Sequence, residues 1–79
     1  MALRLMLAAT LRKYIPGYNG ETGYEVNVEP ASTVRDLCRK LRVPEREVKM
    51  IMIDGLAAGW DSILTGNERV ALFPPIGGG

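Results

Sequence analysis

The sequence predicts an α+β domain in which one main helix packs across one face of a mixed sheet of four to five strands. Three observations lead to this class. Several short segments are apolar throughout or alternate with a period of two, which is typical of strands. One segment repeats apolar residues at helical spacing, and 79 residues are enough for only one small domain. In such a domain, an amphipathic helix and a sheet bury their apolar sides against each other.

The first part of the chain predicts a hairpin. Leu3 to Ala9 is almost wholly apolar apart from Arg4, which predicts a strand that is buried on both faces or lies at the centre of the sheet. Tyr14 to Gly23 is rich in Gly and Asn and is expected to be a loop. Tyr24 to Glu29 alternates with a period of two until Pro30 ends it, as a half-buried strand does. The two strands would pair across this long turn.

A single amphipathic helix is expected to begin after Ser32 or Thr33. Thr33 precedes Asp36 by three positions, which resembles a capping box with Asp in place of Glu. Pro44 ends the helix, because the residue before a proline is disfavoured in the α conformation. The apolar stripe has the spacing i, i+3, i+4, i+7 and consists of Val34, Leu37, Cys38 and Leu41. The opposite face is interpreted as a solvated basic face rather than a site for an acidic partner, and consists of Arg35, Arg39, Lys40 and Arg42.

The second half of the chain adds the remaining strands. Asp54-Gly55 is a favoured hairpin dipeptide, so the strand after it should return antiparallel to the strand before it. Pro74-Pro75 ends the last strand, because proline has no N–H to donate. The predicted elements are a single turn at 45–48, strands at 50–53, 56–58 and 69–73, and an irregular segment at 60–67. If the last strand lies beside the first, the architecture is a β-grasp. Residues 1–75 then form the domain, and residues 76–79 form a flexible glycine tail.

Composition argues against several classes of function. A net charge of +1 disfavours an extended nucleic-acid surface, and no apolar run reaches the roughly 18 residues of a membrane span. The first residues lack the layout of a signal peptide, and the single cysteine cannot form an internal disulfide, so we expect a soluble, cytoplasmic protein. With no histidine and only scattered carboxylates, we expect no metal site, no bound cofactor and no catalytic nucleophile with its base. The chain is therefore not expected to be an enzyme.

The sequence ends in Gly77-Gly78-Gly79, directly after the rigid pair Pro74-Pro75. A free carboxylate on such a tail is a chemical handle, because glycine has no Cβ and can pass through a narrow slot. The residues from Ile76 to Gly79 can span on the order of 10–14 Å, at about 3.3–3.6 Å per residue. A frayed, solubilising end is the alternative interpretation. We place the function at this terminus.

Three stretches of the chain carry a family resemblance. Leu7–Arg12 has the pattern of a first strand and its exit, Ser32–Leu37 that of a helix start, and Arg69–Gly79 that of a strand running into Phe-Pro-Pro and a terminal Gly-Gly. Together they resemble the MoaD/ThiS ubiquitin-like sulfur-carrier family, and most closely its MoaD branch, the small subunits of molybdopterin synthase. Two departures stand out. Gly77 replaces a residue that often carries a side chain, and Ala8 replaces an aromatic residue.

The resemblance implies a carrier whose catalytic groups are supplied by partners. A MoeB-like adenylating enzyme would use ATP to activate the carboxylate of Gly79, and a sulfur donor protein would convert the adenylate into a thiocarboxylate. A MoaE-like large subunit of molybdopterin synthase would then use this sulfur to build a dithiolene. Ile76, Gly77 and Gly78 would enter the partner's channel together with Gly79. Whether the pterin receives molybdenum or tungsten is left open.

Affinity for these partners must come from the folded domain, because ordering a glycine tail costs about 1–2 kcal/mol per residue. The partner surface implied by the resemblance consists of Phe73, Pro74, Pro75, Ala8, Ala57 and Arg12. For Phe73, ordinary core packing is an equal alternative. We interpret Cys38 as a core residue rather than a sulfur-relay thiol, and the four methionines as gap-filling core residues.

Three other interpretations of the tail stay open. A ThiS-type carrier for thiamine thiazole synthesis is disfavoured by the Phe-Pro-Pro run and by the length of the chain. A ubiquitin-like protein modifier would join Gly79 to lysines of other proteins through the same adenylate. The third is a β-grasp interaction module whose tail is inert.

Overall fold

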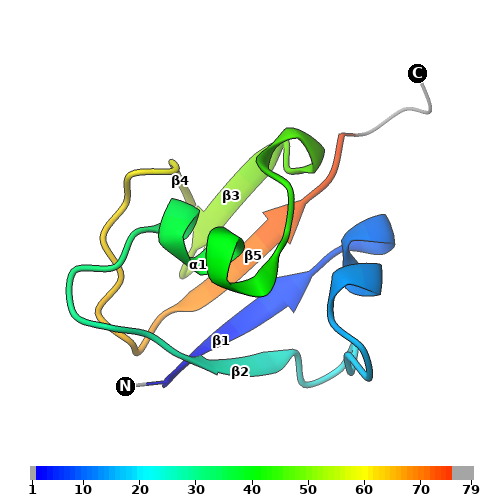
Figure 1. Cartoon of the computed structure of the whole chain (residues 1–79), viewed down its shortest axis with the longest axis horizontal. Helices are drawn as coiled ribbons and strands as arrows, with labels where there is room; N and C mark the ends of the chain where they lie inside the picture. The colour runs from blue at the N-terminus through cyan, green and yellow to red at the C-terminus, as the bar shows by residue number, and fades with distance from the viewer. Residues whose placement is uncertain (1, 76–79) are drawn as a thin grey trace.

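The computed structural model describes residues 2–75 (Figure 1). The elements are β1 (Ala2–Leu7), η1 (Ala9–Tyr14), β2 (Tyr24–Asn27), α1 (Val34–Leu41), η2 (Glu45–Glu47), β3 (Met50–Ile53), β4 (Leu56–Ala58) and β5 (Arg69–Phe73). All predicted strands, the helix and the single turn at η2 are present. None of the helices in this part of the chain is long and apolar enough to cross a membrane. The predicted division at residue 75 falls at the edge of the described residues, so it stays a prediction.

The strands form one mixed sheet in the order β2-β1-β5-β3-β4. β1 pairs antiparallel with β2 and parallel with β5, while β3 pairs antiparallel with both β4 and β5. The last strand therefore lies beside the first, as predicted, and occupies the centre of the sheet. With one main helix on the sheet, this architecture is the expected β-grasp.

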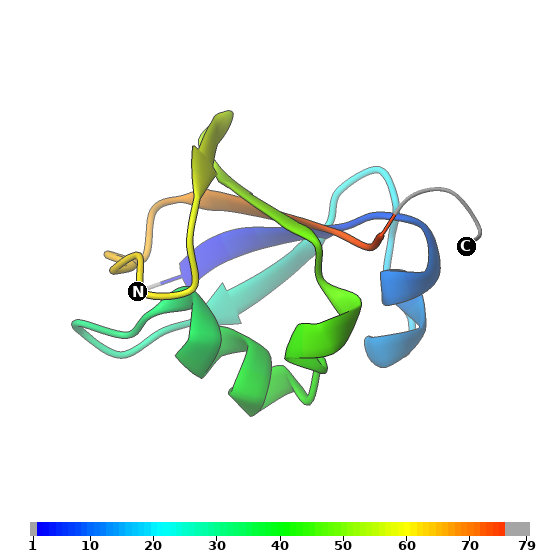
Figure 2. The same cartoon turned by 90° about the horizontal axis from the view of Figure 1, so that it is seen from above.

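One face of the sheet is covered by α1, and the other carries no helix among the described residues (Figure 2). The helix begins with the predicted capping box: Thr33 Oγ1 accepts the N–H of Asp36 at 3.2 Å, and Asp36 Oδ2 accepts the N–H of Thr33 at 3.0 Å. The helix ends at Leu41, because Arg42 turns to the left-handed conformation with φ 60°. Between these two ends, the apolar stripe of α1 packs against the sheet.

The core lies between α1 and the covered face of the sheet. Leu37 and Cys38 from the helix meet buried side chains of the two central strands, among them Leu5, Val70 and Leu72. All five are no more than 2% exposed. In so small a domain this cluster is the main apolar contribution to stability.

The prediction for the first strand was confirmed in one alternative, since β1 is an inner strand between β2 and β5, but it was wrong about where the strand ends. The strand ends at Leu7 rather than Ala9, because Ala9 adopts a positive φ of 48° and starts the short helix η1. It is also not buried on both faces. Leu3, Leu5 and Leu7 are buried while Arg4 is exposed, so the burial alternates. The alternation is hidden in the sequence because Met6, which lies on the face of the sheet away from α1, is apolar as well.

The long turn between β1 and β2 packs back onto β1. Asn19 Oδ1 accepts the N–H of Glu21 at 2.8 Å, and the hydroxyl of Tyr18 accepts the N–H of Leu7 at 2.7 Å. Gly23 has a φ of 75°, and a Cβ there would lie 2.4 Å from Met6 Sδ. Only glycine can be accommodated at this position, because its backbone lies so close to the side chain of Met6. This close contact holds the loop against the sheet beside the end of β1.

Candidate functional site

The end of β5 is held by hydrogen bonds from both neighbouring segments. The carbonyl of Leu72 accepts the N–H of Ala8 at 3.1 Å, and the carbonyl of Phe73 accepts the N–H of Lys49 at 2.7 Å. Pro74 follows half-buried and Pro75 exposed. The backbone is therefore held by hydrogen bonds up to Phe73, directly before the two prolines.

The predicted tail residues Ile76, Gly77, Gly78 and Gly79 lie outside the described residues. β5 ends beside η1, at the end of the domain to which the parallel strands β1 and β5 both point (Figures 1 and 2). A chain leaving Pro75 therefore starts at an edge of the domain and not above its centre.

An apolar row crosses the open face of the sheet. Met6, Ala71, Met52 and Ala57 are successive register partners on β1, β5, β3 and β4. Ala57 is exposed and the other three are half-buried, whereas their strand neighbours such as Leu72 and Ile51 are buried under α1. Side chains alternate between the two faces of a strand, so this row faces away from the helix.

A second pair extends this row toward the tail. Phe73 and Met50 are register partners on β5 and β3, and Met50 is 48% exposed. Phe73 is half-buried, so it is neither a core residue nor a free surface residue. We define the open-face patch as Met6, Met50, Met52, Ala57, Ala71 and Phe73.

The predicted partner surface is only partly contiguous. Ala8 is half-buried and bonded to the end of β5, next to Phe73. Ala57 lies two strands away from β5 on the outer strand β4, and is connected to Phe73 only through the rest of the open-face patch. Ala8 and Phe73 thus lie together, while Ala57 belongs to the far side of the same face.

The interpretation of the methionines as core residues was wrong for Met6, Met50 and Met52, which are half-buried or exposed on the open face. These residues were missed as candidate surface residues. The period of two along each strand was the only available signal, because alternate residues of a strand share a face, whereas the register between strands cannot be read from the sequence. Methionine is flexible and polarizable and adapts to irregular apolar partners.

Arg12 is fixed beside the end of β1. Its Nε donates to the carbonyl of Leu7 at 3.1 Å, and its guanidinium lies over the ring of Tyr18 at 5.7 Å from the centroid. The side chain is nevertheless exposed. Arg12 therefore stabilises the exit of β1, and its guanidinium lies against the loop at Tyr18 and Gly20.

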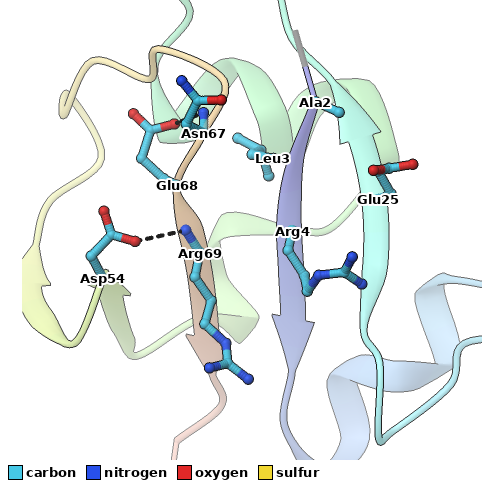
Figure 3. A pocket seen from close by; sticks show the side chains of 8 residues that line it. All are labelled: Ala2, Leu3, Arg4, Glu25, Asp54, Asn67, Glu68 and Arg69. Atoms are coloured by element: carbon cyan, nitrogen blue, oxygen red, sulfur yellow. Dashed lines mark hydrogen bonds between the residues drawn. The ribbon is translucent and has the colours of Figure 1, made fainter.

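A charged cleft of about 490 Å³ lies at the opposite end of the sheet from the tail (Figure 3). Asp54 Oδ1 accepts the N–H of Arg69 at 2.9 Å. Glu68 accepts the N–H groups of Thr65 and Gly66 at 2.6 and 2.8 Å. Burial opposes ionisation of Glu68, but these N–H donors outweigh it and lower its pKa to about 2. These carboxylates accept hydrogen bonds from nearby backbone N–H groups. The cleft is remote from the predicted site at the end of β5.

Cys38 is fully buried in the core, as its place on the helix stripe predicts. Burial raises the pKa of its thiol to about 11, with the charge of Glu45 as a smaller cause. The thiol is thus protonated at neutral pH, and only the thiolate is a good nucleophile. The geometry agrees with a packing role.

The comparisons with known proteins point to one family and one fold. The family described as Mut7-C ubiquitin matches residues 1–77. No curated protein sequence matches the chain.

Three solved structures share the fold along nearly the whole chain. The Haloferax volcanii HVO 2177 protein is 24% identical with a TM-score of 0.75, over 100% of this chain and 87% of its own. Small archaeal modifier protein 1 of the same organism is 22% identical with a TM-score of 0.71, over 95% of this chain and 98% of its own. A candidate molybdopterin converting factor subunit 1 of Pyrococcus furiosus is 21% identical with a TM-score of 0.67, over 95% and 98%.

Proposed function

The chain belongs to the Mut7-C ubiquitin family, and from this premise we propose that it is a carrier whose Gly79 carboxylate is activated by a partner enzyme. Its predicted place among MoaD-like, ubiquitin-like proteins is confirmed. Small proteins of this kind are generally carriers or modifiers rather than enzymes. The catalytic groups in this proposal therefore belong to the partners.

The observation that carries the proposal is the way β5 leads into the tail. β5 lies between β1 and β3, its last two carbonyls are hydrogen-bonded to Ala8 and Lys49, and Pro74-Pro75 follows directly. Proline restricts the backbone, so little entropy is lost at this base when a partner binds the tail. The glycines that follow have no side chains to obstruct a narrow channel.

The proposed chemistry has two steps. An oxygen of the Gly79 carboxylate bonds to the α-phosphorus of ATP on the partner, and pyrophosphate leaves. A donor sulfur at the oxidation level of sulfide then bonds to the acyl carbon, and AMP leaves with the electron pair of the broken C–O bond. The product is a terminal thiocarboxylate. No group of residues 2–75 is assigned a catalytic role in either step.

We assign the sulfur to molybdopterin synthesis, with a MoaE-like large subunit as the acceptor and a MoeB-like enzyme as the activator. Support comes from the Phe-Pro-Pro-Ile-Gly-Gly-Gly segment and from the likeness to the Pyrococcus furiosus protein. The identity of the sulfur donor and of the final metal, molybdenum or tungsten, is outside the proposal. A cytoplasmic location is part of the proposal, because the activating step consumes ATP.

A deletion series tests the activation step. Chains that lack Gly79, or that extend beyond it by one residue, should lose ATP-pyrophosphate exchange with the cognate adenylating enzyme. Their thermal unfolding midpoints should equal that of the full chain, because the change lies beyond the domain. Normal exchange by the shortened chain would contradict the proposal.

A second candidate function is a protein modifier, which the likeness to small archaeal modifier protein 1 favours. The modifier would form an amide between Gly79 and lysines of target proteins after the same adenylation. Denaturing electrophoresis of cells that express a tagged chain separates the two functions. A modifier gives heavier adducts that survive denaturation and vanish without Gly79, whereas a sulfur carrier gives the free chain alone. A ThiS-type role in thiazole synthesis would instead appear as a thiamine requirement when the gene is deleted.

A further inference from the structure

Exposed cations gather where β5 leaves the domain. We define the exit rim as Arg12 and Lys13 on η1, Arg46 on η2, and Lys49 just before β3; all four are exposed. Lys49 is adjacent to the tail base, since its N–H donates to the carbonyl of Phe73 at 2.7 Å. Arg12 lies on the other side, bonded at 3.1 Å to the carbonyl of Leu7 at the end of β1. Lys49 thus lies directly beside the end of β5, and Arg12 lies at the end of the neighbouring strand β1.

The two short helices that carry the exit rim are joined to each other. The hydroxyl of Tyr14 on η1 donates to Glu47 Oε2 on η2, and Lys13 Nζ lies 3.8 Å from Glu47 Oε1. This contact places η1 and η2 side by side at the same end of the molecule as the tail base (Figures 1 and 2). The two helices that carry three of the four rim cations are thus held together at this end of the molecule.

The carboxylates of this surface already have partners. Glu47 is bound by Tyr14 and Lys13, and Glu45 lies 3.5 Å from Arg35 Nε on α1. Within residues 2–75, Arg12, Arg46 and Lys49 have no carboxylate within ion-pair distance. The exit rim therefore carries three exposed positive charges that no carboxylate of residues 2–75 neutralises by an ion pair.

We propose that the exit rim is the docking surface for an acidic patch on the protein that acts on the tail. The inference rests on the proposed function, because a protein that receives the tail must surround the place where the tail leaves the domain. Complementary charge accelerates the encounter of two proteins and orients them, more than it adds affinity. The open-face patch then supplies the apolar contacts, and the rim sets which way the tail points when the two proteins meet.

Charge reversal at the rim tests the proposal. Lys49→Glu and Arg46→Glu should each lower kcat/KM for adenylation of the chain by about 10-fold at low ionic strength. The loss should shrink as salt is added, and kcat at saturating carrier should not change. The matched control is Arg39→Glu, which makes the same charge change at an exposed position of α1 outside the rim. It should stay within about twofold of the unchanged chain.

Four results would overturn the inference. Equal losses for Lys49→Glu and Arg39→Glu would mean that only net charge matters, and no loss for either rim variant would leave the rim without a role. In both cases an active unchanged chain would still support the proposed function. Binding of a mixed-sequence RNA that the rim variants lose would reassign the surface to nucleic acid. If the unchanged chain itself is not adenylated, the proposed function fails, and the partner assigned to the rim fails with it.

Discussion

The two faces of β5 differ in burial and in what they contact. Val70 and Leu72 point under α1 and are at most 1% exposed, whereas Ala71 and Phe73 lie half-buried on the open face. The same five-residue strand thus contributes its alternate residues to the core and to the open-face patch. The residues under α1 stabilise the domain, and the residues on the open face are available to a partner. Substitutions can therefore change one of these two properties without the other.

The largest effect is expected on the covered face. Leu72→Ala removes a fully buried side chain and leaves a cavity, so we expect the free energy of unfolding to fall by about 2–5 kcal/mol. Urea denaturation measures this. Adenylation per folded molecule should stay unchanged, since Leu72 does not reach the open face. A loss below about 1 kcal/mol would mean that the two faces are not distinct in their contribution to stability.

The open face should respond in the opposite way. Met50→Asp places a charge in the open-face patch at a residue that is 48% exposed, so stability should change by less than about 1 kcal/mol. Affinity for the adenylating enzyme should fall by about 30-fold or more, which corresponds to about 2 kcal/mol at a central contact residue. Isothermal titration measures the affinity.

Ile63→Asp is the matched control for that variant. Ile63 is an apolar residue with 57% exposure, and it lies outside the open face, opposite Thr33 in an isolated bridge. Its affinity for the enzyme should stay within about twofold of that of the unchanged chain. Equal losses for the two variants would remove the special role of the open face.

The loop that leads into β5 provides a smaller, pH-dependent effect. Glu68→Gln weakens the charge-assisted bonds to Thr65 and Gly66 and should cost about 1–3 kcal/mol of stability at neutral pH. The folded pKa of Glu68 is about 2, below its ordinary 4.5, so its contribution is full above pH 4.5 and is lost as the pH falls toward 2. The stability difference between the two chains should therefore close over that range. A difference that persists at pH 2 would contradict the assignment.

The smallest effect is expected at Cys38. Cys38→Ala should cost about 1–2 kcal/mol through lost packing and leave the rate of sulfur transfer unchanged. A thiol with a pKa of about 11 inside the core should react with alkylating reagents only when the chain unfolds. Mass spectrometry of the native chain after brief alkylation measures this. Rapid labelling, or a loss of sulfur transfer in the variant, would contradict the packing role and support a role for this thiol in sulfur relay.

Much of the fold was predictable from local patterns. The capping box at Thr33 and the Asp54-Gly55 hairpin are short-range signals, and both are confirmed. The period of two predicted the strand β2, which however ends at Asn27 rather than Glu29 and buries only Val26. The end of β1 was not predictable, because the positive φ of Ala9 has no local sequence signal and depends on how η1 packs. Apolar residues on both faces of β1 also concealed which face is covered.

The candidate site was predictable only in part. The Phe73-Pro74-Pro75 segment was identified because it is contiguous in the sequence. The apolar row from Met6 to Ala57 joins four strands, so it exists only once the register is known. The same holds for the exit rim, since its two short helices meet only through the contacts of Glu47 with Tyr14 and Lys13. The assignment of Gly79 as the attachment site stays a prediction.

The most direct test of that assignment is the intact mass of the full chain after incubation with its adenylating enzyme, ATP and a sulfide source. The activated carrier should gain the mass difference between sulfur and oxygen, and fragmentation should locate the change at Gly79. The gain should be absent when ATP is omitted. An unchanged mass with an enzyme that hydrolyses ATP normally, or a mass change located anywhere before Gly79, would contradict a sulfur carrier activated at its terminal glycine.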